Sequence, residues 1–413
     1  MSDRTVLCEA LVVTATGAPA FEGCVVVEEG RILDVLEGAA PAGLHGERTL
    51  RLGGRTLLPG LIDAHVHAAA VDADIAGQAR RRHESEVALL AGSQLGAMLR
   101  RGFTTVRDAG GADAGFKRAI EQGALAGPRL LVSGRPLSQT GGHGDQRGAG
   151  EQACAGGAGP HVGMVHVIAD GPEQVRLAAR EELRRGADQI KVMAGGGVVS
   201  PTDRLESVQY SPEELSAAVV AASAAGTYVL AHAYTPAAIE ACVRAGVRSV
   251  EHGNLLDGPT ARLMAERGTY LVPTLVTYER LREEGERHSI SRESLEKLEL
   301  VVEAGSRSLE LALGAGVRIG SGSDLLGPMQ RHQGEEIAIA ARALGAMGAI
   351  VATTRTNAEL LGLEGEIGTI EAGKRADLVV SDQNALDDPG ILGRPGGVAL
   401  VMLGGRVVLD RRS

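Results

Sequence analysis

Hydrophobic and polar positions along the chain change their rhythm twice. Over the first 56 residues, short alternating runs separated by turn residues predict strands at 5–15, 24–29 and 31–36. From residue 57 onward, short apolar runs alternate with longer amphipathic stretches. The short-strand pattern then returns at 376–382 and 400–409. We therefore expect β-type sequence at both ends of the chain and an alternating α/β region between them.

The middle region contains eight segments typical of buried strands. They lie at 57–67, 104–108, 128–133, 189–193, 228–233, 248–252, 270–275 and 317–323. Helical patterns separate most of them, including those at 84–101, 172–185, 212–225 and 291–313, with a last helix near 335–362. Eight alternating units predict an α/β fold with a (β/α)8 barrel of the TIM type, whose active sites form at the carboxyl ends of the strands.

The two ends of the chain are expected to pair with each other. Residues 1–56 and 363–413 would form a small β-sandwich domain, and residues 57–362 would form the barrel. A chain of 413 residues with 44% hydrophobic content is long enough for one large domain and a smaller one.

Composition narrows the classes of partner. The net charge is −10 and charges of both signs are interleaved, which argues against nucleic acid or an anionic membrane. The four cysteines are scattered without a C-x-x-C pair, so neither a disulfide framework nor a thiolate zinc site is predicted. The first residues lack a signal-peptide pattern, and no apolar run reaches about 18 residues. We therefore expect a soluble, cytoplasmic protein.

Ligand-type side chains recur at the ends of the predicted strands. His65 and His67 end the first segment, and side chains two residues apart in a strand face the same side, so both can bind one ion. The other candidates are Lys191 in the fourth segment, His232 and His252 at the ends of the fifth and sixth, and Asp324 after the eighth. Taken singly, a strand-end histidine is often covered by a loop, and Asp324 suits a helix N-cap. Six such residues at one end of successive strands together predict a metal centre.

This constellation resembles the amidohydrolase superfamily over nearly the whole chain. Local motifs look like the imidazolonepropionase-related branch that contains metal-dependent prolidases. These motifs are Gly141 to Asp145, Lys191 with Gly195 to Pro201, Ala231 to Pro236, and Gly368 to Asp377. The resemblance implies a hydrolase that cleaves an amide bond, most simply a dipeptidase of the Xaa-Pro (prolidase) type.

The resemblance also implies a binuclear centre with two divalent ions, zinc being the expected metal. The more buried ion would be bound by His65, His67 and Asp324, and the more exposed one by His232 and His252. Lys191 would carry a carboxylate on its amine and bridge the two ions, although a lysine that extends out of the barrel is the alternative. Two cations lower the pKa of a shared water enough to form hydroxide. Asp324 would then accept the proton and pass it to the leaving amine.

Three further residues are candidates for substrate contacts. By the resemblance, His143, on the loop after the third strand, would hydrogen-bond the substrate carbonyl or carboxylate and so act in catalysis. Tyr234 lies two residues after His232 and would face the same cavity, although packing at the barrel rim is an equal alternative. Arg204 suits a substrate carboxylate, but a solvated surface position is the favoured interpretation.

Other polar residues are weaker candidates. Asp108 follows the second strand and would either orient a ligand histidine or cap a helix. His161, His166 and His332 lack ligand spacing, so we expect no role for them. The run Gly195 to Gly197 is not followed by Lys-Ser or Lys-Thr, which argues against a phosphate loop.

Three functions remain open from sequence alone. The first is a dipeptidase, and the second is an amidase or carbamate hydrolase acting on an N-acyl amino acid, a urea-type xenobiotic or a toxin amide. Loops set the substrate, so the fold does not separate these two. A scaffold without chemistry is disfavoured because all six ligands are present, and a mononuclear deaminase would not require Lys191. The expected partners are a small-molecule or dipeptide substrate and further copies of the chain in a homo-oligomer.

Overall fold

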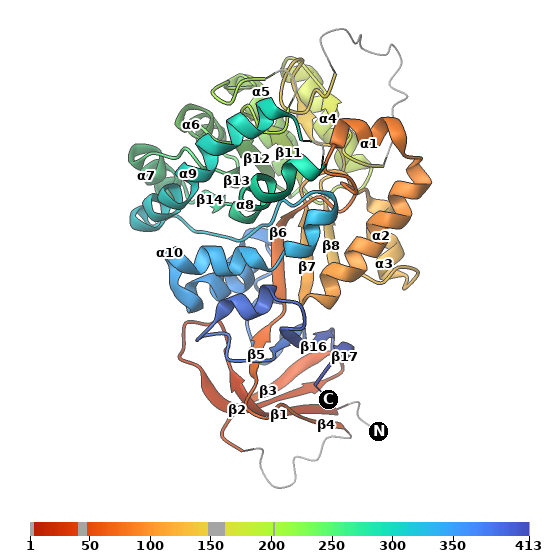
Figure 1. Ribbon diagram of the computed structural model, residues 1–413, viewed down its shortest axis with the longest axis vertical. Coiled ribbons are helices and arrows are strands. Elements are labelled where there is room, and N and C mark those ends of the chain that lie inside the picture. The colour runs from red at the N-terminus through yellow and green to blue at the C-terminus, as the bar shows by residue number, and fades with distance from the viewer. Residues whose placement is uncertain (1–3, 40–47, 148–161, 201–202, 289, 413) are drawn as a thin grey trace.

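The computed structural model describes residues 4–39, 48–147, 162–200, 203–288 and 290–412. Figure 1 shows an elongated molecule with a β-sheet at one end and a larger body of helices and strands at the other. Both chain termini lie at the sheet end. The fold is mixed α/β.

Both ends of the chain contribute to one eight-stranded sheet, as expected from their sequence pattern. Its strands are β1 (Arg4–Val12), β2 (Phe21–Glu28), β3 (Arg31–Glu37), β4 (Arg48–Arg51), β5 (Thr56–Pro59), β15 (Leu378–Ser381), β16 (Val398–Leu403) and β17 (Arg406–Asp410). The order is β17-β16-β15-β5-β1-β2-β3, with β4 paired to β1. The two ends join where β5 pairs antiparallel with β15. Leu7, Leu57 and Leu378 are fully buried in the core of this sheet.

The larger body contains nine named strands among the described residues. They are β6 (Leu61–Val66), β7 (Phe103–Asp108), β8 (Arg129–Val132), β9 (Leu137–Ser138), β10 (Val167–Ile168), β11 (Ile190–Met193), β12 (Val229–Ala233), β13 (Ser249–His252) and β14 (Tyr270–Val272). Every pairing among them is parallel. They form two sheets, β6-β7-β8 and β10-β9-β11-β12-β13-β14.

Backbone hydrogen bonds connect these two sheets at two places, one beside β11 and one at the β14 edge. The Asp188 N–H donates to the Val132 carbonyl, at 2.7 Å, beside β8 and β11. At the other edge, residues 317–324 lie between β14 and β6: the Gly320 N–H donates to Leu271 at 2.8 Å, and Ser321 accepts from the Ala64 N–H at 2.9 Å. These backbone hydrogen bonds join the two sheets within one body.

The prediction of an eighth strand at 317–323 is wrong, because this segment does not form a regular strand. It makes one isolated parallel bridge, between Leu271 and Ile319. The Asn357 side chain accepts a hydrogen bond from the Ser321 N–H and donates one to the Ser321 carbonyl, at 3.0 and 2.8 Å. The Asn357 side chain thus makes hydrogen bonds that a neighbouring strand would otherwise make. The segment is held between β14 and β6 without forming a continuous strand.

Helices surround the parallel strands (Figure 1). They are α1 (Ile75–Arg81), α2 (Glu84–Arg100), α3 (Ala114–Glu121), α4 (Pro172–Arg184), α5 (Pro212–Ala224), α6 (Pro236–Ala245), α7 (Gly258–Arg267), α8 (Leu275–Glu284), α9 (Arg292–Ala315), α10 (Glu335–Val351) and α11 (Asn357–Leu361). Short turns are η1 (Gly285–His288), η2 (Gly327–His332), the π-helical η3 (Ala352–Thr356) and η4 (Pro389–Gly393). The four helices predicted from amphipathic patterns are present as α2, α4, α5 and α9.

The last predicted helix, 335–362, is interrupted. Gly345 has φ 70° and ψ 167° inside α10, a backbone conformation that breaks the helix, and η3 separates α10 from α11. By length and composition alone, Glu335–Leu361 is apolar enough to cross a membrane, which is weak evidence for a span. In the structure its Glu336 is buried and accepts a hydrogen bond from the Val276 N–H.

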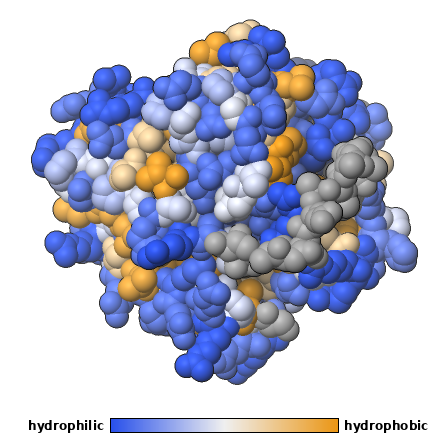
Figure 2. All heavy atoms as spheres, turned by 90° about the horizontal axis from the view of Figure 1, so that it is seen from above, coloured by the Kyte–Doolittle hydropathy of each residue, from blue (hydrophilic) through white to orange (hydrophobic). Residues whose placement is uncertain are grey.

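The end of the molecule opposite the sheet has a mostly hydrophilic surface (Figure 2). Hydrophobic side chains on this face are scattered among the hydrophilic ones. Leu89, Leu177 and Val220 are examples of large apolar side chains that are exposed, one on each of α2, α4 and α5. Single exposed apolar residues of this kind are ordinary on a protein surface.

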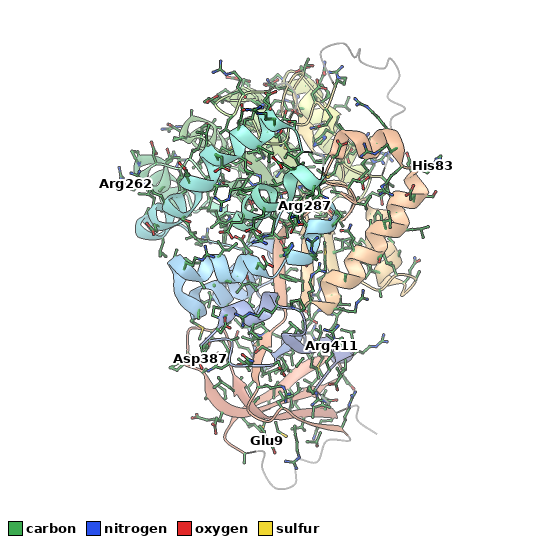
Figure 3. The ribbon with its side chains drawn as sticks, viewed as in Figure 1. Glu9, His83, Arg262, Arg287, Asp387 and Arg411 are labelled. Atoms are coloured by element: carbon green, nitrogen blue, oxygen red, sulfur yellow. The ribbon has the colours of Figure 1, made fainter. Side chains whose placement is uncertain are left out.

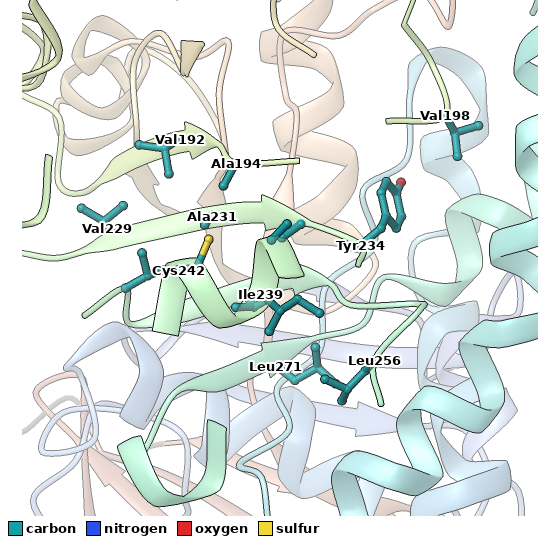
Figure 4. Packing of buried hydrophobic residues seen from close by; sticks show 14 of the residues in the cluster. Val192, Ala194, Val198, Val229, Ala231, Tyr234, Ile239, Cys242, Leu256 and Leu271 are labelled. Carbon is teal, nitrogen blue, oxygen red and sulfur yellow. The ribbon is translucent and has the colours of Figure 1, made fainter. Parts of the chain in front are cut away.

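Side chains of the parallel strands alternate between two environments. Val192 of β11 and Val229 and Ala231 of β12 belong to the same buried hydrophobic cluster as Ile239 and Cys242 of α6 (Figure 4). Residues between them face the other side of the strands, because successive side chains in a strand point in opposite directions. Polar side chains at these inward positions are held away from solvent and open onto one cavity.

Candidate metal centre

The structure brings all six predicted metal ligands to one cavity. Its lining includes His65, His67, Lys191, His232, His252 and Asp324. The cavity lies at the carboxyl ends of β6, β11, β12 and β13, where the sequence pattern placed it. All five of its histidine and lysine candidates are at least 95% buried, Lys191 being 1% exposed.

Three of these residues form the tightest group. Among the described residues, His65, His67 and Asp324 present ligand atoms that all lie within 4.8 Å of one another. Asp324 Oδ1 is 3.4 Å from His65 Nε2 and 3.1 Å from His67 Nε2. Two imidazoles and a carboxylate at these separations form a set of donors suited to a divalent cation such as zinc.

The other three candidates lie beside this group. The ring centroid of His252 is 5.1 Å from that of His65 and 4.6 Å from that of His232. His252 Nδ1 is 3.8 Å from Asp324 Oδ2. Lys191 lines the same cavity, so the six side chains surround a shared space rather than separate positions.

Hydrogen bonds leave one nitrogen of each ring available to a metal. His67 Nδ1 donates to the Gly110 carbonyl at 2.8 Å, and His65 Nδ1 lies 2.7 Å from Glu251 Oε2. Both rings therefore keep Nε2 toward Asp324. His232 Nε2 donates to the Gly196 carbonyl at 3.0 Å, which leaves its Nδ1 as the lone-pair nitrogen. Such partners fix the tautomer and orientation of metal-binding histidines.

Burial sets the charge of these rings. It lowers the pKa of His65, His232 and His252 well below the ordinary value, and the neighbouring Lys191 acts in the same direction. These imidazoles are neutral at physiological pH, which is the form that binds metals. Burial also lowers the pKa of His67, but the adjacent Asp324 outweighs it and raises that pKa. A cation at this position would take the place of the His67 proton.

Lys191 is the least ordinary member of the cavity. Burial lowers its pKa to about 8, although Glu251 and Asp324 act in the opposite direction. Its Nζ makes no hydrogen bond to any residue in the described part of the chain. A lysine with a depressed pKa has a larger share of free amine at neutral pH, and the free amine is the form that reacts with carbon dioxide.

Backbone strain concentrates at the same strand ends. His252, Thr274 and Asp324 have φ values of 75°, 50° and 51°, in the left-handed region that residues with a side chain rarely adopt. Thr274 Oγ1 is hydrogen-bonded to His252 Nδ1 at 2.8 Å. Strained residues of this kind persist where the surroundings impose them, typically at functional sites.

A buried charge network beneath the histidines was missed in the sequence. Glu251 accepts a hydrogen bond from Arg107 Nη2 at 2.9 Å and from Ser249 Oγ at 2.5 Å, and both charged side chains are completely buried. Arg107 Nε also donates to the Ala64 carbonyl. The available signal was a charged residue directly before each strand-end candidate, in Arg107-Asp108 and Glu251-His252.

Asp108 supports a ligand indirectly. Its carboxylate accepts backbone N–H groups of Ala68, Gly110 and Ala112, at 2.7, 2.9 and 3.2 Å. It thereby holds the loop whose Gly110 carbonyl accepts from His67. The N-cap alternative is wrong, because α3 is capped by Asp113. Burial raises the pKa of Asp108 to about 6.

His143 and Tyr234 both line the cavity. The His143 ring stacks on His232, with centroids 4.2 Å apart and planes 14° apart. Gly197 makes this possible, because a Cβ there would lie 2.0 Å from the His143 ring. The buried His143 Nδ1 has no hydrogen-bond partner in the described part of the chain.

Tyr234 lines the cavity and also packs at its wall. Its ring stacks at 5.2 Å on His252 and packs within the hydrophobic core, and its hydroxyl is 2.9 Å from that of Tyr278. The paired hydroxyls lie at the wall of the cavity, since both tyrosines line it.

Arg204 is not brought into the cavity. Its side chain is 88% exposed and its nearest acidic group, Glu206, lies at 3.8 Å. The backbone of Arg204 forms a turn, accepting from Ser207 N–H and Oγ, and this turn directs the side chain to solvent.

The three histidines for which no role was expected lie in different surroundings. His166 lines the cavity, although its sequence position gave no ligand spacing. His332 is hydrogen-bonded to Glu284 and Glu335, outside the cavity. His161 lies outside the described residues.

Comparison with known proteins identifies the family. The sequence pattern of the amidohydrolase family matches residues 56–408. The chain belongs to the amidohydrolase family. It is therefore a hydrolytic enzyme that acts on amide bonds, which confirms the resemblance noted in its motifs.

Several amidohydrolases resemble this chain over most of their length. Ochratoxinase of Aspergillus niger is 34% identical over 365 residues, covering 85% of this chain and 75% of that protein. The crystal structure of a prolidase in complex with N-methylphosphonate-L-proline has a TM-score of 0.95 and 43% identity, covering 98% of this chain and all of the other. Imidazolonepropionase of Rhizorhabdus wittichii is 27% identical over 392 residues, 87% of this chain and 88% of that protein.

Proposed function

We propose that this amidohydrolase is a binuclear metal-dependent dipeptidase that cleaves Xaa-Pro dipeptides. The observation that carries the proposal is the convergence of six ligand-type side chains in a cavity whose wall includes His143 and Tyr234. The similarity to a prolidase over the whole chain supports the choice of substrate.

The proposed scaffold is a closed barrel of residues 57–362, with residues 1–56 and 363–413 as a β-sandwich domain. It is supported by the hydrogen bonds that join β8 to the β11 region and that place residues 317–324 between β14 and β6. A closed ring would direct all carboxyl strand ends to one face, where the candidate ligands lie.

The donor set fits two divalent cations. His65, His67 and Asp324 would hold one ion, and His232 and His252 the other. Lys191, as an N-carboxylated side chain, would bridge them, because an uncharged amine can gain a carboxylate whereas an ammonium repels cations. When bound, such ions polarise the scissile carbonyl and lower the pKa of water to the neutral range.

Asp324 is the proposed proton carrier. Burial alone would raise its pKa, but the adjacent His65 and the hydrogen bond with His67 hold this pKa below its ordinary value. The carboxylate is therefore ionised at neutral pH and can accept a proton from the attacking water. Transfer of that proton to the leaving proline nitrogen completes cleavage of the amide.

His143 and Tyr234 are proposed to bind the substrate. An imidazole N–H or a phenol O–H can each donate to the carboxylate of the leaving amino acid. Access is provided by a neighbouring hollow of about 270 Å³, which shares Ile75, Gln146 and Val199 with the smaller cavity of about 70 Å³ at the ligands. The part of the substrate away from the metals would extend into this hollow.

An alternative is an amidase for an N-acyl amino acid, a toxin amide, a carbamate or a urea-type xenobiotic. The 34% identity to ochratoxinase favours a toxin amide within this group. The adjoining hollow would then hold a bulky acyl group. Both functions use the same ligands and differ in what lies on the two sides of the scissile bond.

One comparison separates the two functions. We expect metal-loaded protein to cleave an Xaa-Pro dipeptide far faster than its C-terminal amide, because the amide lacks the charge that His143 and Tyr234 would bind. Equal cleavage of acid and amide would reject the dipeptidase. Faster cleavage of an N-acyl amino acid than of any Xaa-Pro dipeptide would assign the alternative.

A further inference from the structure

A second cavity, of about 520 Å³, lies away from the metal centre. It is formed by the end of α2, the η2–α10 junction, the segment after η4 and the residue that follows β17. The described residues that line it include five arginines, Arg100, Arg101, Arg331, Arg394 and Arg411, and one carboxylate, Glu335. We call it the arginine pocket. Its positive charge contrasts with the net charge of −10 of the whole chain.

Two of the five arginines are already neutralised. Arg331 pairs with Glu284, and Arg394 pairs with Asp388. Glu335 is itself engaged, with its Oε1 2.6 Å from His332 Nδ1. Among the described residues that line the pocket, no carboxylate is therefore left to pair with the other three arginines.

Arg100 and Arg411 have no acidic partner in the described part of the chain. Arg100 ends α2, and Arg411 follows β17, so residues far apart in sequence bring two unpaired guanidinium groups to one cavity. Solvated arginines are ordinary at a protein surface. Two unpaired arginines that border one cavity together with a third, partly buried guanidinium are an uncommon arrangement.

The third guanidinium belongs to Arg101. Its Nε and Nη2 both donate to Gln333 Oε1, at 3.2 and 2.8 Å, and no carboxylate of the described chain lies within salt-bridge distance. Burial lowers the pKa of Arg101 to about 10; Arg100 acts in the same direction, and the more distant Asp63 opposes it. An amide oxygen carries no net charge, so this cation is desolvated without a directly paired counterion, which is costly.

Apart from His332, which is hydrogen-bonded to Glu284 and Glu335, the remaining side chains of the lining are apolar. Ala97, Leu392, Pro395 and Val398 contribute to the wall between the arginines. A ligand that fills this space would combine an anionic head with a hydrophobic body. Arginine suits the head group, because its planar fork pairs with the two oxygens of a carboxylate or phosphate.

We propose that the arginine pocket binds an organic oxyanion, a carboxylate or a phosphate ester carried on an apolar body. The head group contacts Arg100, Arg101 and Arg411, and the body lies against Leu392 and Val398. The site is separate from the metal centre, since the two cavities share no lining residue.

Isothermal titration of the metal-loaded protein tests the proposal. The probes are octanoate and octyl phosphate, with octanol as the uncharged control, and the tighter of the two anions identifies the preferred head group. We expect at least one anion to bind and octanol not to bind. The double variant Arg100→Gln/Arg411→Gln should weaken binding of that anion at least tenfold.

A variant matched to each single substitution controls for the loss of one positive charge. Arg262 is exposed on α7, in a different part of the molecule from Arg411 (Figure 3), and Arg262→Gln should leave the affinity unchanged. Because both pocket arginines are exposed, the double variant should keep the wild-type melting temperature, and the single variants provide a second comparison. Equal affinity of wild type and double variant, or equal binding of octanol and octanoate, would overturn the proposal.

Discussion

Replacing Glu251 by glutamine tests how the protein prepares His65 to bind metal. The carboxylate lies 2.7 Å from His65 Nδ1 and 2.9 Å from Arg107 Nη2. A carboxylate only accepts hydrogen bonds, so it requires the proton on His65 Nδ1 and leaves Nε2 free. An amide can also donate to Nδ1, which would place the proton on Nε2, the nitrogen that faces Asp324.

Two effects of Glu251→Gln can be estimated separately. Loss of a carboxylate that orients a metal-binding histidine typically lowers metal affinity about ten- to a hundredfold. Loss of one partner of a buried ion pair costs about 3 to 5 kcal/mol of unfolding free energy. We expect the loss of unfolding free energy to lie near the lower end of this range. The amide oxygen can still accept a hydrogen bond from Arg107, which is completely buried.

Glu182→Gln is the matched control. Glu182 is also buried and accepts from Arg135 Nε and Nη2, at 2.9 and 2.6 Å, but lies outside the metal cavity. Metal content after dialysis against buffers of fixed free zinc, together with denaturant unfolding, separates the effects. Both variants should lose stability, and only Glu251→Gln should lose metal affinity. Wild-type zinc affinity in Glu251→Gln would refute the proposed role of Glu251.

Three further tests address Lys191, Tyr234 and His143. Lys191→Ala should lose most activity and regain part of it with an added short-chain carboxylate, whereas Lys191→Arg should not recover because guanidinium stays cationic; activity in the Lys191→Arg variant would place the bridge elsewhere. Tyr234→Phe should lower kcat/KM for an Xaa-Pro dipeptide by roughly ten- to two-hundredfold with unchanged metal content. Tyr278→Phe is its control, and an equal loss in both would indicate that the paired hydroxyls act only in packing. Gly197→Ala should displace the His143 ring and lower kcat/KM while zinc remains bound; unchanged kinetics would exclude His143 from substrate binding.

Much of the fold follows from local pattern. The change from short strands to alternating strands and helices predicted the pairing of the two chain ends and seven of the parallel strands, because periodicity reflects which faces are buried. The short strands β9 and β10 were not predicted. The same pattern failed at 317–323, where the Asn357 side chain replaces strand pairing. That interaction joins residues 36 positions apart and leaves no local signal.

The candidate ligands were also predictable, since each lies at the end of an apolar run and parallel strands end on one face. The supporting residues were harder to predict. Glu251 and Arg107 are 144 positions apart, and only the folded structure brings them into contact. His166 lies directly before β10, a two-residue strand that the sequence pattern did not predict. Arg204 is exposed, in agreement with the favoured interpretation of its sequence position, because a turn directs its side chain to solvent.

Elemental analysis of the purified protein, paired with an activity assay in chelator, tests the metal centre most directly. We expect close to two divalent ions per chain, with zinc the principal metal. A strong chelator should abolish amide hydrolysis, and added zinc should restore it. Absence of bound transition metal together with full activity in chelator would contradict the account.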